Sequence, residues 1–132
     1  MTNIQAAIGL SQIEKLTEIL ELKRKLQKSY LDGLSKKVKF LKASSDTEPS
    51  YWIIPILFKN VKQKQNVEVA LNNQKIETRP LFYPIDTLPF YETNHTIKNA
   101  KSIFRKGLIL PSYPGLSENQ IEKIKHTIIK NL

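Results

Sequence analysis

The sequence from Tyr51 to Phe58 is YWIIPILF, a run of aromatic and β-branched residues with one proline inside it. Such a composition predicts a buried strand. Pro55 has no N–H to donate to a neighbouring strand, so it favours an edge position or a bulge. Two shorter runs, Ile76–Thr78 and Leu108–Leu110, predict further strands. These three segments define a small sheet.

Helical patterns surround the strands. Predicted helices cover residues 62–74, residues 97–106 up to Gly107, and a C-terminal stretch that Ser117 and Gln120 open with a capping-box pattern. Alternation of single strands and helices in so short a chain is typical of a layered fold. The sequence therefore predicts an α+β fold, with a small, mainly antiparallel sheet of about three strands packed with helices.

Residues 1–35 have the pattern of one long helix that precedes the sheet. Apolar side chains recur at steps of three and four, Thr2 or Asn3 can cap the start, and Gly33 is a plausible stop. The small residues of its first turns suit close packing against a surface outside this chain. We expect one domain over 1–132, made of a long linking helix (1–35) and an α+β small domain (36–132).

Composition excludes several classes of protein. The 132 residues include no cysteine, so disulfides and cysteine metal sites are impossible. No apolar run approaches the roughly 20 residues that span a bilayer. We expect a cytoplasmic protein that contacts no membrane. His95 and His126 fit no metal-ligand pattern, and no phosphate-binding glycine motif is present. The sequence predicts neither a metal site nor a catalytic residue.

The net charge of +9 raises the alternative of a nucleic-acid-binding protein. Only Arg24, Arg79 and Arg105 among the 21 basic residues are arginines, whereas recognition of bases and phosphates relies heavily on arginine. The lysines are also spread along the chain. We favour a solvated basic surface and expect no nucleic-acid partner.

The segment 77–91, ETRPLFYPIDTLPFY, combines one guanidinium with several aromatic rings and three prolines. Prolines stiffen a loop, so it presents its side chains reproducibly. Arg79 can bind a carboxylate or phosphate through two hydrogen bonds, and Tyr83 can hydrogen-bond or stack. The alternative is structural: Arg79 forms an ion pair with Glu77 or Asp86, and the aromatic rings belong to the core. Both remain open at this point.

Three segments carry a family resemblance: TNIQAAIGLSQI at 2–13, TRPLFYP at 78–84 and LPSYPGLSENQI at 110–121. Their order and spacing resemble the C-terminal part of the DegT/StrS family of pyridoxal-phosphate-dependent sugar aminotransferases, most closely its perosamine-synthase-like branch. The similarity runs along the whole chain without large gaps.

The resemblance implies a homodimeric enzyme that moves an amino group, usually from glutamate, onto a nucleotide-linked keto-sugar for surface polysaccharide or glycan synthesis. A large N-terminal domain holds pyridoxal phosphate on a lysine, and the small C-terminal domain completes the substrate pocket. It further implies that Arg79, Tyr83 and Asp86 bind substrate. Asp86 stands where family members often have histidine, which places a negative charge beside the expected diphosphate.

The family's cofactor-bearing lysine region precedes the first of these segments, and the chain contains no counterpart of it. We therefore expect pyridoxal phosphate in the complete enzyme and none held by this chain alone, which is expected to be inactive by itself. The expected partners are an N-terminal pyridoxal-phosphate-binding domain or a full-length aminotransferase, the nucleotide-sugar substrate, and a second copy of the chain. The alternative is a non-catalytic nucleotide-sugar-binding or regulatory module.

Overall fold

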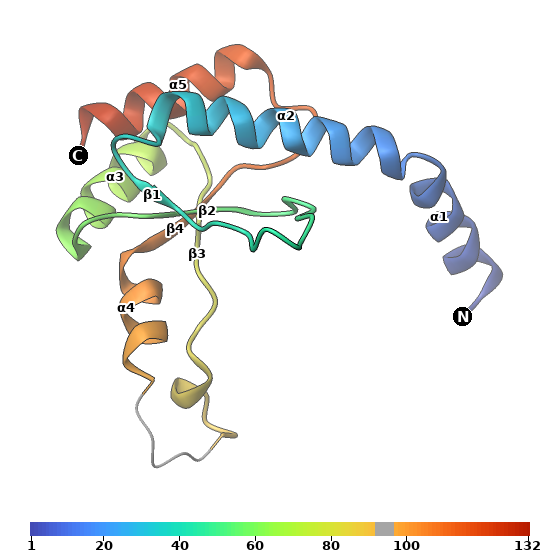
Figure 1. The fold of residues 1–132 in the computed structure, drawn as a ribbon, viewed down its shortest axis with the longest axis horizontal. Coiled ribbons are helices and arrows are strands. Elements are labelled where there is room, and N and C mark those ends of the chain that lie inside the picture. Colours follow the sequence, from blue (N-terminus) through green and yellow to red (C-terminus); the bar gives the residue numbers. More distant parts are fainter. Residues whose placement is uncertain (92–96) are drawn as a thin grey trace.

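The computed structural model describes residues 1–91 and 97–132 and contains a four-stranded sheet (Figure 1). The strands are β1 (Lys39–Phe40), β2 (Ile54–Leu57), β3 (Arg79–Pro80) and β4 (Gly107–Leu110). They are ordered β1-β2-β4-β3, and every neighbouring pair is antiparallel. The predicted α+β fold is confirmed, with four strands in place of about three.

The prediction that Pro55 marks an edge strand or a bulge is wrong, because β2 lies between β1 and β4. Phe58 donates its backbone N–H to Lys106 O at 3.0 Å, on the β4 side. Since these groups alternate along a strand, the nitrogen of Pro55 faces the β1 side. β1 ends at Phe40, opposite Ile56, so no carbonyl of that strand requires a donor at Pro55.

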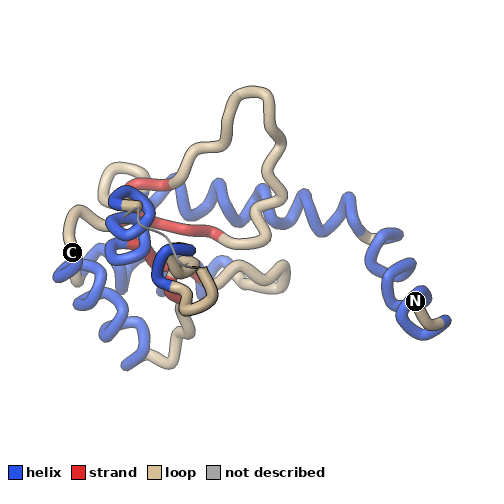
Figure 2. The backbone as a smooth tube through the Cα atoms, turned by 90° about the horizontal axis from the view of Figure 1, so that it is seen from below, coloured by secondary structure: helices blue, strands red, loops and turns tan. Residues whose placement is uncertain are grey.

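One face of the sheet forms the hydrophobic core with α2 (Leu16–Leu34), α3 (Val61–Asn73) and α5 (Glu118–Lys130). β2 alternates between fully buried residues, Ile54 and Ile56, and half-buried ones on the opposite face. The buried set includes Tyr30, Leu34, Phe40, Val67, Leu71, Leu108, Leu110, Ile121, Ile124 and Ile128. Figure 2 shows the strands gathered at one end of the molecule, with α2 running from there towards α1.

Side-chain caps fix the predicted helix starts. Asn60 Oδ1 accepts the N–H of Gln63 at 2.9 Å at the start of α3, and Ser117 and Gln120 form the predicted capping box of α5. The strand predicted at Ile76–Thr78 is wrong: the strand is β3, directly after it. Ile76 donates its N–H to Leu71 O at 3.0 Å. This hydrogen bond belongs to the C-terminal end of α3, so Ile76 does not pair with a strand of the sheet.

The predicted single helix over 1–35 is two helices, α1 (Asn3–Glu14) and α2. At Lys15 the backbone leaves the helical region (φ −100°, ψ 3°), and its N–H bonds Gln12 O at 3.2 Å, three residues back. α1 has no buried residue and projects away from the sheet (Figures 1 and 2). Because no core contact holds α1 in line with α2, the chain is free to turn there.

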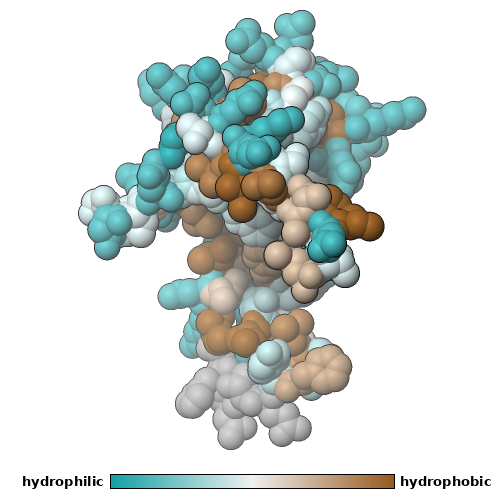
Figure 3. All heavy atoms as spheres, turned by 90° about the vertical axis from the view of Figure 1, so that its right-hand side faces the viewer, coloured by the Kyte–Doolittle hydropathy of each residue, from teal (hydrophilic) through white to brown (hydrophobic). Residues whose placement is uncertain are grey.

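Apolar side chains are exposed on α1 and on the segment between β3 and α4 (Lys98–Lys106). Figure 3, which faces the side on which α1 projects, shows apolar patches in the upper half and in the lower protrusion. The exposed residues on α1 are Ile4, Ile8, Leu10 and Ile13. Within the described residues, no helix combines the length and apolar character needed to cross a bilayer.

Gly107, where α4 meets β4, is required by close packing. A Cβ built there would lie 1.9 Å from Leu81 Cδ1 and 2.9 Å from the backbone oxygen of Ile103. Gly107→Ala should therefore lower the free energy of unfolding by about 1–3 kcal/mol, the usual cost of overpacking.

Urea unfolding followed by circular dichroism measures this effect. Gly9→Ala is the matched control, because nothing lies within 4 Å of a Cβ at Gly9. That substitution should leave the midpoint unchanged or raise it slightly, since alanine favours helix over glycine. Equal destabilisation by both substitutions would contradict the packing at Gly107.

Candidate functional site

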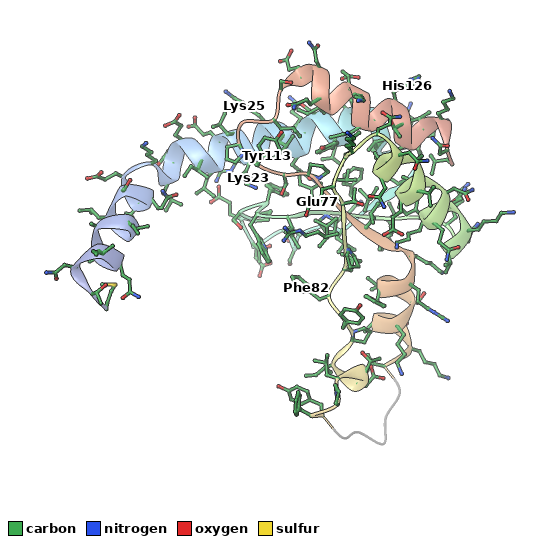
Figure 4. All side chains as sticks on the ribbon, turned by 180° about the vertical axis from the view of Figure 1, so that it is seen from behind. Lys23, Lys25, Glu77, Phe82, Tyr113 and His126 are labelled. Carbon is green, nitrogen blue, oxygen red and sulfur yellow. The ribbon has the colours of Figure 1, made fainter. Side chains whose placement is uncertain are left out.

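A cavity of about 820 Å³ lies beside the β3 end of the sheet. Its wall comes from the residues before β2, the segment that joins α3 to β3, the segment after β4, and the adjoining faces of α2 and α5. Figure 4 shows three of its residues, Lys23, Glu77 and Tyr113, which come from different parts of the sequence. The antiparallel sheet brings these segments together.

Lys23 of α2 ties two of the loops to the helix. Its Nζ donates to Trp52 O at 3.2 Å, to Ser112 O, and to Ser112 Oγ at 3.4 Å. Ser112 Oγ also donates to Trp52 O at 2.9 Å. Burial lowers the pKa of Lys23 from its ordinary value. The amine thus acts as a three-way link that fixes the cavity wall.

Arg79 lines this cavity from β3. Its Nε and Nη2 both donate to Glu77 Oε1 at 3.3 Å, so the structural alternative foreseen for Arg79 is realised. Both side chains are largely exposed, 76% for Arg79 and 78% for Glu77. Exposed ion pairs contribute only about 0–1 kcal/mol. An anionic ligand can therefore replace Glu77 at little cost.

The aromatic residues of 80–91 lie at the surface and not in the core, contrary to the structural alternative. Phe82 and Tyr83 are 68% and 63% exposed. Phe82 stacks on Trp52 with ring centroids 6.1 Å apart, and Tyr83 packs against Phe104 of α4 at 4.6 Å. This segment leaves the sheet, passes through the 3-10 turn η1 (Ile85–Thr87) and presents its rings outward.

Asp86 connects this segment to α4. Its Oδ2 accepts from Lys101 Nζ at 2.8 Å and from the backbone N–H of Ile97 at 3.1 Å, and its side chain is only 2% exposed. The hydrogen bond from Lys101 holds the pKa of Asp86 below its ordinary value; burial opposes this effect and the Ile97 N–H adds to it. Asp86 therefore orders the loop that follows Arg79 and Tyr83.

The structure brings only one of the three predicted substrate-binding residues to the cavity. Arg79 lines it, whereas Tyr83 lies further along the protruding segment and Asp86 is engaged with Lys101. Lys23, Trp52 and Ser112 were not foreseen. The prediction of a buried strand over Tyr51–Phe58 is wrong for Trp52, which lies before β2 and is 63% exposed. The substrate-binding role of Arg79, Tyr83 and Asp86 stays a prediction.

The residues of the cavity do not fit pyridoxal phosphate. That cofactor needs a free lysine amine, a carboxylate for its ring nitrogen and a cradle of N–H groups for its phosphate. Three lysines line the wall: Lys23 already donates to Trp52 and Ser112, whereas Lys75 and Lys123 form no ion pair among the described residues. The wall offers one carboxylate, Glu77, which is paired with Arg79, and no glycine among the described residues for a phosphate cradle. Among residues 1–91 and 97–132, no group of His, Cys, Asp and Glu side chains suits a metal ion; His95 lies outside those ranges.

The described residues thus form an α+β domain with a four-stranded antiparallel sheet, a helix α1 without buried residues, and a cavity lined by Arg79. Residues 1–129 match the model of the DegT/DnrJ/EryC1/StrS aminotransferase family. The chain belongs to this family, and the predicted resemblance is confirmed.

Curated relatives agree with this assignment. The chain is 36% identical over 131 residues to the GDP-perosamine synthase of Escherichia coli O157:H7, with 97% of this chain and 35% of that protein covered. It is 37% identical over 138 residues to the GDP-perosamine synthase of Vibrio cholerae, with 97% and 36% covered. The chain thus spans about a third of the length of these relatives.

Solved structures support the fold. A putative sugar aminotransferase from Streptococcus pneumoniae matches all of this chain over 36% of its own, with a TM-score of 0.86 and 21% identity. An aminotransferase of pseudaminic acid biosynthesis from Helicobacter pylori covers 97% of this chain over 36% of its own, with a TM-score of 0.84 and 21% identity. The matched part has the size of an aminotransferase C-terminal domain.

The Asp86–Lys101 contact makes stability depend on pH. A carboxyl group whose pKa is lower in the folded state stabilises the fold above its ordinary pKa of 3.8, and this contribution is lost as the pH falls through the folded-state pKa. Asp86→Asn should therefore melt at a lower temperature than the parent at neutral pH, and the difference should shrink towards about pH 2.

Thermal melts of the two proteins over this pH range test the contact. Asp32→Asn, an exposed α2 residue with no ion pair among the described residues, is the control and should show little difference at any pH. A melting difference for Asp86→Asn that stays constant from neutral to acid would contradict the ionic role of Asp86.

Proposed function

We propose that this chain is the C-terminal part of a pyridoxal-phosphate-dependent aminotransferase that aminates a nucleotide-linked keto-sugar for surface polysaccharide or glycan synthesis. The observation that carries the proposal is the family match over residues 1–129. A further relative, 31% identical over 136 residues, is the lipopolysaccharide biosynthesis protein RfbH of Salmonella typhimurium. In this proposal the chain is inactive until a cofactor-binding domain joins it.

The uncovered surface of α1 supports the need for a partner. Ile4, Ile8 and Ile13 are each more than half exposed, and no residue of α1 is buried. Covering one large aliphatic side chain gains roughly 1.5–3 kcal/mol. A cofactor-binding domain, or a second copy of the enzyme in a cytoplasmic homodimer, would cover this helix and obtain that stabilisation.

In the assembled enzyme the cofactor, held by the other domain, would supply the carbon–nitrogen chemistry. This chain would supply the substrate side. Arg79 would exchange Glu77 for the diphosphate of the nucleotide sugar or for the carboxylate of the amino donor. Tyr83 would present its exposed hydroxyl and ring to the sugar. Asp86 would keep this segment in place through Lys101.

Reconstitution tests the proposal. The chain is combined with the pyridoxal-phosphate-binding domain of the Escherichia coli O157:H7 GDP-perosamine synthase, and amino transfer from glutamate to a GDP-linked keto-sugar is measured. Neither part alone should act, and the pair should form product. Arg79→Ala in the pair should lower kcat/KM by about tenfold to hundredfold, since a charge-assisted hydrogen bond to substrate is lost.

Arg105→Ala is the matched control, because Arg105 is an exposed arginine at the end of α4 and lies outside the cavity wall. It should leave kcat/KM unchanged. Activity of the chain alone, or two domains that do not associate at micromolar concentration, would contradict the proposal. Binding of the nucleotide sugar by the chain alone without reconstituted activity would favour the alternative of a non-catalytic binding module.

A further inference from the structure

A second cavity, of about 940 Å³, lies at the β1 edge of the sheet. Its wall comes from the end of α2, from β1 and the residues after it, from the end of β2 and from the end of α4. It shares no lining residue with the cavity that contains Arg79. Figure 1 shows these chain segments meeting on the left of the sheet. Nothing in the proposed aminotransferase role uses this site.

Six lysines line the cavity. They are Lys36, Lys37, Lys39, Lys42, Lys59 and Lys106. Among the described residues, no aspartate or glutamate lines the cavity and none of the six lysines forms an ion pair. Like charges held close together repel, so a bound anion would reduce the electrostatic repulsion between these lysines.

Strand pairing places these lysines together. Lys39 lies opposite Leu57 on β1 and β2, and Leu57 lies opposite Gly107 on β4. Lys59 and Lys106 flank the same end of the sheet, where Phe58 donates its N–H to Lys106 O at 3.0 Å. The positions are thus set by the sheet and not by mobile loops alone. Because strand pairing fixes the backbone of these lysines, their backbone positions stay the same when no ligand is bound.

The floor of the cavity is apolar and partly aromatic. Leu41, Leu57 and Ile103 line it, and Tyr51 stands at its side. Tyr51 has a φ of 50°, the left-handed region that costs a bulky residue roughly 1–2 kcal/mol. Such strained residues cluster at ligand sites. β1 is also an edge strand, and within the described residues no strand pairs with its outer backbone groups.

We propose that this cavity binds a small molecule that carries a polyphosphate chain, with a nucleoside triphosphate as the best-fitting class. The phosphates would lie among the lysines, and the base would lie on Tyr51 and the apolar floor. Lysine acts as a point charge without the bidentate fork of arginine, so a site built from lysines alone favours ligands with several phosphate groups. The volume lies within the usual range of roughly 300–1,000 Å³ for small-molecule sites.

Calorimetric titration of the chain with GTP and with inorganic tripolyphosphate at low ionic strength tests the site, and amide chemical shifts locate it. Lys39→Gln combined with Lys106→Gln should weaken binding by about tenfold or more. Lys62→Gln combined with Lys130→Gln removes the same charge from exposed positions on α3 and α5 outside this cavity and should leave affinity unchanged.

Circular dichroism confirms that both double variants fold. Binding of both probes, with shifts at residues 36–42, 59 and 106, establishes a site that recognises the phosphates; tighter binding of GTP adds recognition of the base. The proposal is overturned if neither probe binds, if the two double variants lose affinity equally, or if the shifts centre on Arg79. None of these results depends on reconstituted aminotransferase activity.

Discussion

The structure depends on the pairing of β2 with β4. This pair aligns Ile54 and Ile56 with Leu110 and Leu108, and all four side chains are buried against α2, α3 and α5. The partners lie more than fifty residues apart in the sequence, so the chain between them must fold back as α3, β3 and α4.

The β2–β4 pairing also positions both cavities. One cavity is lined by residues that precede β2 and follow β4, and the other by residues at the end of β2 and just before β4. Trp52 precedes β2 and Ser112 follows β4, and Lys23 joins them to α2 beside Arg79. At the other end, the same register gathers Lys59, Lys106 and Lys39. The core thus supports two charged sites of different composition. One contains an arginine with a weakly held carboxylate, and the charged groups that the described residues place around the other are all lysines.

Local patterns predicted the caps at Thr2 and Ser117, the end of α4 at Gly107 and the two central strands, because each depends on residues close in sequence. The predicted stop at Gly33 is wrong, because Gly33 lies inside α2, which ends at Leu34. Features that depend on distant segments were missed. Pro55 is tolerated in a central strand only because β1 stops at Phe40, and Trp52 is exposed because it lies before β2 begins. The three-way role of Lys23 joins residues as many as 89 positions apart.

In the candidate site, too, the features set by nearby residues were predicted and those set by distant segments were missed. Arg79 was singled out from its proline- and aromatic-rich surroundings, and it lies in a cavity. Its weak pairing with Glu77, and the engagement of Asp86 with Lys101, depend on tertiary geometry that no spacing in the sequence reveals. The break at Lys15 has no proline or glycine to signal it, and it separates a helix with no core contact from one that is anchored at Leu26 and Tyr30.

Hydrogen exchange of backbone amides, with and without an added pyridoxal-phosphate-binding domain, tests the central claim that this domain is folded at its core and incomplete at its surface. In the chain alone, amides of β2 and β4 should exchange slowly and those of α1 quickly, because α1 has no buried residue. The added domain should slow exchange in α1 and in residues 80–91 while leaving β2 and β4 unchanged. Slow exchange of α1 in the chain alone, or no change when the domain is added, would contradict the claim.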